Sequence, residues 1–177
     1  MSTYRRFTRF STTTKPPRID QIPDGGICLS AFVIFTPPGK HNQVLMGRLN
    51  PDAHWEHLGA LGRERAEANS KGWMLPSSHL ILFESPQEAA SRILIEQLSI
   101  TDQKLTGPYV FSEVSGPKNH WDLEFVFLGE RAEVPKNDAW SELKFVDTDV
   151  VRKEEIVRSH EDILARVGKW NRGVVPQ

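Results

Sequence analysis

The chain has 177 residues, of which 38% are hydrophobic and 25% charged, and its 22 basic and 23 acidic side chains give a net charge of -1. This length suits one hydrophobic core and is short for two. The single cysteine, Cys28, excludes an internal disulfide framework, and no apolar run reaches the roughly 18 to 20 residues that cross a bilayer. We therefore expect a cytoplasmic protein without a membrane-spanning segment.

The charge is unevenly distributed. Residues 1–18 contain five basic and no acidic side chains, which leaves 17 basic and 23 acidic residues, a net -6, for the rest. We expect residues 1–24 to form a basic, Ser/Thr-rich extension and residues 25–177 to form one domain. The extension is typical of an organellar transit peptide, a nucleic-acid-binding arm or a plain polar tail. The acidic body argues against nucleic acid as a partner of the whole protein.

Strands dominate the first part of the domain. Cys28 to Phe35 is an apolar, β-branched run that predicts a buried strand, with Cys28 as a small buried residue. We expect it to form a hairpin with a second strand at Gln43 to Arg48. The long polar stretch from Leu49 to Gly72 is longer than a hairpin connection needs, so it is a candidate functional excursion with a short helix at Leu61 to Asn69.

The remaining elements follow in order. Two short strands are expected at Trp73 to Pro76 and at His79 to Phe83. A helix is predicted from Pro86 to Leu98, with Ser85 as N-cap of a Ser-x-x-Glu capping box. Further strands are predicted at Tyr109 to Val114, Trp121 to Leu128 and Leu143 to Asp147, and a closing helix or pair of helices at Val151 to Lys169. This mixture indicates an α/β domain of the α+β type.

The predicted helix carries an apolar face and a charged ridge. Glu88, Arg92 and Glu96 are spaced four residues apart and form the ridge. Ile93 belongs to the apolar face, together with Ala89, Ala90, Leu94 and Leu98. Gln97 also falls on this face, where its amide needs polar partners.

With Glu84, the stretch from Ser78 to Ile100 resembles the box of the Nudix family of pyrophosphohydrolases, G-x5-E-x7-R-E-U-x-E-E-x-G-U, where U is a large aliphatic residue. The pattern fits without a gap. Trp73 to Pro76 is similar to the Trp-x-Leu-Pro that leads into that box, and Trp140 to Asp149 resembles the late strand of the family. Over about Ile27 to Arg166, the resemblance implies an α/β/α sandwich with a mixed β-sheet.

The resemblance also implies an activity. Family members are divalent-metal-dependent hydrolases of nucleoside diphosphate-linked compounds, and they are usually homodimers. Their helix presents three carboxylates, at spacing i, i+3 and i+4, to Mg²⁺ or Mn²⁺. Here these positions hold Ile93, Glu96 and Gln97, so that one carboxylate remains, and Ser78 replaces the glycine of the box. The box is therefore degenerate.

Several residues are candidates for the site. By resemblance, Arg92 supports the loop by reaching Glu84, and Glu84 is a catalytic carboxylate, a metal ligand or the partner in a structural ion pair. Glu96 is a catalytic residue and a metal ligand, together with Gln97. Substitute ligands are His79, which follows the altered turn, and Asp122 and Glu124, which alternate with His120 on one strand face.

Two main hypotheses follow. One is a divergent hydrolase of nucleoside diphosphate-linked compounds with a rebuilt metal site. The other is a non-catalytic module that binds a nucleotide or a protein partner. A third hypothesis is an interaction protein in which the old cleft packs shut around Ile93. The pair His54 and His57 invites a zinc site, but without a further ligand cluster a packed loop is the simpler interpretation.

Overall fold

The computed structural model describes residues 26–53, 63–115, 118 and 120–170. Every structural statement below concerns this part of the chain. The basic extension and the pair His54 and His57 lie outside it, so both stay predictions. No helix in the described ranges is long and apolar enough to cross a membrane.

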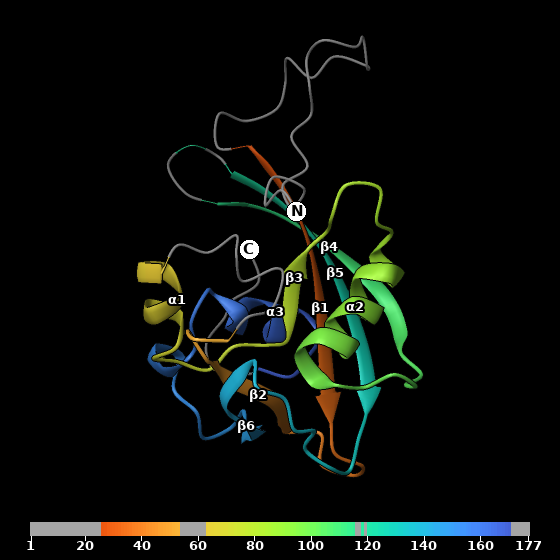
Figure 1. Ribbon diagram of the computed structural model, residues 1–177, viewed down its shortest axis with the longest axis vertical. Coiled ribbons are helices and arrows are strands. Elements are labelled where there is room, and N and C mark those ends of the chain that lie inside the picture. Colours follow the sequence, from red (N-terminus) through yellow and green to blue (C-terminus); the bar gives the residue numbers. More distant parts are fainter. Residues whose placement is uncertain (1–25, 54–62, 116–117, 119, 171–177) are drawn as a thin grey trace, which may run out of the picture.

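The described chain folds into two β-sheets and three α-helices (Figure 1). The larger sheet has the order β3-β1-β5-β4, and the smaller pairs β2 with β6. The strands are β1 (Ile27–Thr36), β2 (Gln43–Leu49), β3 (Ser77–His79), β4 (Thr106–Ser115), β5 (His120–Glu130) and β6 (Trp140–Asp147). The helices are α1 (Arg63–Asn69), α2 (Pro86–Leu98) and α3 (His160–Arg166), with a 3-10 turn, η4, at Lys153–Glu155.

Strand β1 lies in the middle of the larger sheet. It pairs in parallel with β5 from Ile27 to Thr36 and antiparallel with β3, so the sheet is mixed, as predicted. The predicted hairpin of the first two strands is wrong, because β2 pairs with β6 instead. Both hydrogen-bonding edges of β1 are already occupied, and β2 therefore belongs to a second sheet.

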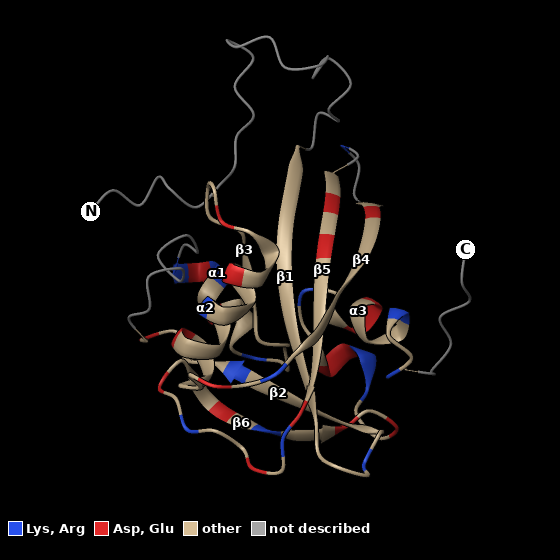
Figure 2. Cartoon of the chain, turned by 90° about the vertical axis from the view of Figure 1, so that its right-hand side faces the viewer, with Lys and Arg blue, Asp and Glu red and all other residues tan. Residues whose placement is uncertain are grey.

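Two cores cover the two faces of β1. Its residues Ala31, Val33 and Phe35 pack against α2, whereas Phe32 and Ile34 pack on the side of α3. Figures 1 and 2 both show α2 and α3 on opposite sides of β1. The alternation of side chains along a strand makes this arrangement possible, since an apolar strand without a polar face needs cover on both sides. The expected α/β/α sandwich is confirmed.

Helix α2 has the predicted bounds. Ser85 Oγ accepts a hydrogen bond from Glu88 N at 3.2 Å, and the Glu88 carboxylate accepts one from Ser85 N at 2.8 Å, which completes the capping box. The helix ends at Ser99, which adopts the left-handed conformation with φ 55°. Ser99 occupies the position of the last glycine of the box, where glycine would adopt this φ without steric cost.

Two other predicted elements differ from the structure, and the closing region follows one of its two predicted forms. The strand expected from His79 to Phe83 ends at His79, because the chain then turns back with Phe83 at φ 69°. The segment from Trp73 to Pro76 makes only single bridges, Gly47 with Met74 and Trp73 with Ile156, and it reaches the larger sheet where Val33 N donates to Pro76 O at 3.0 Å. The closing helical region is broken into η4 and α3.

The break in the closing region has a local cause. Arg158 and Ser159 both have positive φ, 64° and 57°, and two successive left-handed residues cannot continue a right-handed helix. The alternative of two helical pieces is therefore the correct one.

Candidate functional site

Arg92 and Glu84 hold the box together. Arg92 Nε and Nη2 donate to the two oxygens of Glu84 at 2.7 and 2.9 Å, and Ile81 N donates to Glu84 Oε2 at 2.9 Å. Arg92 also donates to Ser78 Oγ and to His79 O at 3.1 and 2.9 Å. The hydroxyl that replaces the glycine of the box is thus part of this network. These bonds fix the loop 80–84 against α2.

The two box positions that lack carboxylates are closed to solvent. Ile93 and Gln97 both have 0% exposure. The Gln97 amide donates to Ser77 O at 2.8 Å and accepts from Ser77 N at 3.1 Å, so it fastens β3 to α2 as a peptide group would. The polar partners that Gln97 needs on the apolar face are the backbone atoms of Ser77, and these contacts give Gln97 a structural role.

Glu96 is the one box carboxylate that remains on the helix. Its side chain is 25% exposed, and its Oε2 lies 3.7 Å from Arg92 Nη1. Neither Glu96 nor Glu84 belongs to a group of three potential metal ligands in the described residues. Of the three helix carboxylates that the resemblance implies, only Glu96 is present, so the described residues on this side of the sheet lack the full set of metal ligands.

A cavity of about 620 Å³ lies on the opposite face of β1. The register of the sheet explains its polar lining, because Cys28 pairs with Asp122, and Ser30 pairs with both His79 and Glu124. Paired residues share a face of the sheet, and so do residues two apart along a strand. The predicted face of His120, Asp122 and Glu124 therefore meets residues of β1 and β3. We call this cavity the cleft.

Contacts within the cleft are short. Cys28 Sγ lies 2.8 Å from His79 Nδ1, and Ser30 Oγ lies 3.2 Å from the same nitrogen. His120 Nε2 lies 3.2 Å from Asp122 Oδ1. Cys28 is only half-buried, so its interpretation as a small buried residue is wrong. The partners of Cys28 come from distant strands, and the sequence carried no local signal for them.

Burial changes the protonation of the groups in the cleft. Burial, reinforced by Arg158 and Arg65, lowers the pKa of His79 to about 4, so the imidazole is neutral at pH 7. Burial also raises the pKa of the Cys28 thiol. The pKa of Glu124 is raised to about 7 by burial and by neighbouring acids, although Arg166 opposes the shift. Perturbed groups that share a concave site are typical of functional sites.

Both charge signs line the cleft. Arg65 on α1 and Arg158 before α3 supply positive charge. Acidic positions lie on β5, β4 and α3 (Figure 2), and Arg166 pairs with two of them, Glu113 at 2.6 Å and Glu124 at 3.9 Å. The pKa of Arg158 is lowered mainly by burial and secondly by the positive charge of Arg65. The two guanidinium groups therefore lie close enough to repel each other. Sequence analysis missed both arginines, since neither belongs to a motif.

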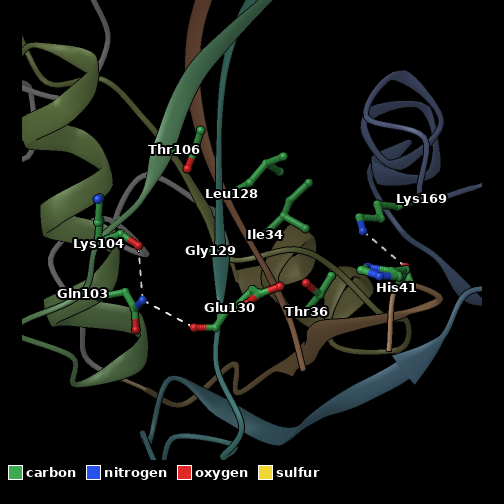
Figure 3. A pocket seen from close by; sticks show the side chains of 10 residues that line it. All are labelled: Ile34, Thr36, His41, Gln103, Lys104, Thr106, Leu128, Gly129, Glu130 and Lys169. Atoms are coloured by element: carbon green, nitrogen blue, oxygen red, sulfur yellow. Dashed lines mark hydrogen bonds between the residues drawn. The ribbon is translucent and has the colours of Figure 1, made fainter. Parts of the chain in front are cut away.

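A second cavity of about 470 Å³ opens at the other end of β1 and β5. Figure 3 shows Gln103 and Lys104 on one side of it and His41 and Lys169 on the other. Gln103 Nε2 donates to Glu130 O at 3.4 Å, and Lys169 Nζ donates to His41 O at 3.3 Å. The side chains of Lys104, His41 and Glu130 are exposed. The cleft gathers many more titratable side chains, and we take it as the candidate site.

Comparison with known proteins identifies the fold. A MutT Nudix hydrolase from Burkholderia pseudomallei matches with a TM-score of 0.55 and 15% identity, over 80% of this chain and 98% of that one. A MutT protein from Methanosarcina mazei Go1 matches with a TM-score of 0.56 and 16% identity, over 86% and 99%. The Nudix domain of Shewanella oneidensis NrtR, solved with ADP-ribose, matches with a TM-score of 0.57 and 13% identity, over 81% of this chain and 88% of that one.

No protein-family model matches the chain, and no curated protein matches it. At 13 to 16% identity, the structural likeness shows a common fold. The chain has the Nudix fold.

Proposed function

We propose that this Nudix-fold protein binds an anionic, nucleotide-derived ligand in the cleft and does not hydrolyse it through the box. The observation that carries the proposal is the closure of the box, where Ile93 and Gln97 have no exposed surface. A metal ion at these positions would require moving a core side chain and breaking two hydrogen bonds to Ser77. The non-catalytic alternative is thus favoured over the divergent hydrolase.

The ligand class is supported by the size and charge of the cleft. A volume of about 620 Å³ lies within the range of small-molecule sites, about 300 to 1,000 Å³. Arg65 and Arg158 face this space, and guanidinium groups bind the paired oxygens of a diphosphate well. One protein of similar fold, the NrtR Nudix domain, was solved with ADP-ribose. ADP-ribose is therefore the first ligand to test.

Helix α1 offers a matched pair of variants for this test. Arg65 lines the cleft, whereas Arg63 pairs with Glu67 and Asp52 in solvent. Calorimetric titration of ADP-ribose should give saturable binding. The affinity should fall by about 10- to 100-fold in Arg65→Gln and in Arg158→Gln, because a charged hydrogen bond contributes about 1.5 to 3 kcal/mol. It should stay unchanged in Arg63→Gln.

Hydrolysis is the second candidate function, and the partial exposure of Glu96 beside Arg92 favours it. It would need Mg²⁺ or Mn²⁺ held by Glu96, with Glu84 as a further ligand or catalytic group. Product release from ADP-ribose, dinucleoside polyphosphates and oxidised nucleotides should be followed with either metal. We expect none. Turnover that is lost in Glu96→Gln would overturn the binding proposal, and absence of both binding and turnover would favour a protein partner.

A further inference from the structure

Three potential metal ligands converge at the end of the cleft where β1 and β5 begin, and a fourth lies beside one of them. Three ligand atoms, one each from Cys28, His120 and Asp122, all lie within 4.8 Å of one another. His79 approaches the same cysteine, with its Nδ1 2.8 Å from Cys28 Sγ. The four side chains come from three adjacent strands of one sheet. We propose that Cys28, His79, His120 and Asp122 bind one zinc ion.

The distances between the ligand atoms are close to those of a tetrahedral zinc site. Zinc binds sulfur at about 2.3 Å and nitrogen or oxygen at about 2.0 to 2.2 Å, which places the ligand atoms of a tetrahedral site roughly 3.3 to 3.8 Å apart. The Cys28–His79 and His120–Asp122 separations are 2.8 and 3.2 Å. The three-residue group extends to 4.8 Å at most. Side-chain adjustments of about 1 Å would bring the ligand atoms of Cys28, His120 and Asp122 to zinc distance, and His79, beside Cys28, is the imidazole placed to complete the four.

The chemistry of the ligand set selects the ion. One sulfur and two imidazoles suit zinc and related transition metals, whereas magnesium prefers oxygen ligands throughout. Cys28 would bind as the thiolate and release its proton to solvent. The thiolate and the Asp122 carboxylate together balance the two charges of the ion. None of the four residues occupies a carboxylate position of the box, so this site is separate from the metal site that the resemblance implies.

The sheet already fixes most of the geometry. Cys28 and Asp122 are register partners in the parallel pair β1–β5, and His79 is anchored by the pairing of Ser30 with its backbone position. Ligands on paired strands keep their relative positions better than ligands on loops. The half-buried side chains also leave the site reachable from the cleft.

Titration with zinc and cobalt tests the proposal on tag-free, chelator-treated protein. We expect one ion per chain by calorimetry. Cobalt should produce thiolate-to-metal charge-transfer absorption, which is absent in Cys28→Ser. Affinity for zinc should fall by at least about 100-fold in His120→Ala and Asp122→Asn, because loss of even an outer-shell partner costs 10- to 100-fold. It should also fall in His79→Ala.

Matched controls use residues of the same types outside the cluster. His41→Ala and Asp102→Asn change exposed side chains and should leave zinc affinity unchanged. The double variant His54→Ala/His57→Ala tests the other histidine pair and should also bind normally. The proposal would be overturned if zinc binding were lost only in that double variant. It would also be overturned if cobalt bound without the thiolate-to-metal absorption. Unchanged affinity in His79→Ala would overturn the assignment of the fourth ligand.

Thiol reactivity gives a second readout that does not need a variant. Cys28 is the one cysteine of the chain, so the rate of reaction with a thiol reagent reports on this sulfur alone. Saturating zinc should slow alkylation of the folded protein by at least about tenfold, since a bound thiolate is withdrawn from reaction. An unchanged rate, together with measurable zinc binding, would place the ion elsewhere. ADP-ribose binding does not enter this test, so the two proposals can fail separately.

Discussion

Strands β1 and β3 separate two regions of opposite character. On the side of α2, the box positions of Ile93 and Gln97 are closed to solvent, and Gln97 is bonded to Ser77. On the side of α3, the cleft is open and lined by histidines, a thiol, acids and arginines. The difference teaches that the same sheet has a tightly packed, hydrogen-bonded box on one face and a polar cavity with titratable side chains on the other.

The strongest test of this difference between the two faces is to place a carboxylate at the buried position of Ile93. Ile93→Glu should lower the free energy of unfolding by at least about 4 kcal/mol, because it places an unpaired charge in the core. Ile95→Glu is the matched control, since Ile95 lies on the same helix with 54% exposure, and it should cost less than about 0.5 kcal/mol. Urea denaturation measures both. An Ile93→Glu protein that is stable and binds Mg²⁺ would show that the box side opens.

Removal of the central arginine of the box should have the next largest effect. Arg92→Ala leaves the Glu84 carboxylate, which is only 12% exposed, without its partner, and we expect a loss of about 2 to 4 kcal/mol. Arg63→Ala removes an ion pair of exposed side chains and should cost less than about 0.5 kcal/mol. Denaturation curves of the two variants should differ accordingly. Equal, small losses would show that the Arg92 network is dispensable for folding.

A buried histidine on the side of the cleft, His160, predicts that the free energy of unfolding depends on pH. His160 is buried, its Nδ1 accepts from Leu75 N at 2.9 Å, and its pKa is lowered well below the ordinary value by burial and by Arg158. The unfolded chain takes up this proton below about pH 6.5 and the folded chain does not. The contribution of His160 is therefore complete above that pH and is lost as the pH falls, by about 1.4 kcal/mol per pH unit.

His160→Asn keeps an acceptor near Leu75 N but cannot be protonated. As the pH falls from 6.5 to 5, the free energy of unfolding should decrease less steeply for this variant than for the wild type. The difference between the two slopes should be about 1.4 kcal/mol per pH unit. The slope is the quantity to compare, because the smaller side chain also lowers stability at every pH. Parallel slopes for the two proteins would mean that His160 is protonated in the folded state.

The smallest expected effect comes from the loop of the box. Phe83 is 96% exposed and has φ 69°, a conformation that costs a bulky residue about 1 kcal/mol and that asparagine tolerates. Phe83→Asn should therefore raise the unfolding free energy by about 0.5 to 1 kcal/mol. A thermal unfolding midpoint below that of the wild type would show that the exposed ring has contacts that stabilise the folded chain.

Local signals predicted some parts of the structure well. The capping box and proline placed α2 at its observed bounds, because a helix end is determined by residues adjacent in sequence. The pairing of β2 was not predictable in this way, since it depends on which edges of β1 distant strands occupy. The positive φ values at Phe83 and Arg158 were also missed, because neither residue type favours that conformation.

The candidate site was predictable to a similar degree. The alternation of His120, Asp122 and Glu124 placed three side chains on one face, and all three line the cleft. Their meeting with Cys28 needed the parallel pairing of β1 and β5, which no local pattern shows. The Mg²⁺ or Mn²⁺ site and the homodimer stay predictions.

The pairing of β1 with β5 has a consequence for how the chain is made. The ten residues of β1 can pair with β5 only after the chain has been synthesised as far as Glu130. On the ribosome, β1 therefore emerges as an apolar segment long before its neighbour exists, and such segments are prone to aggregate. Contacts between distant residues also slow folding. Truncation before residue 130 should consequently yield insoluble chains, and chaperones that bind exposed apolar strands should recognise nascent β1.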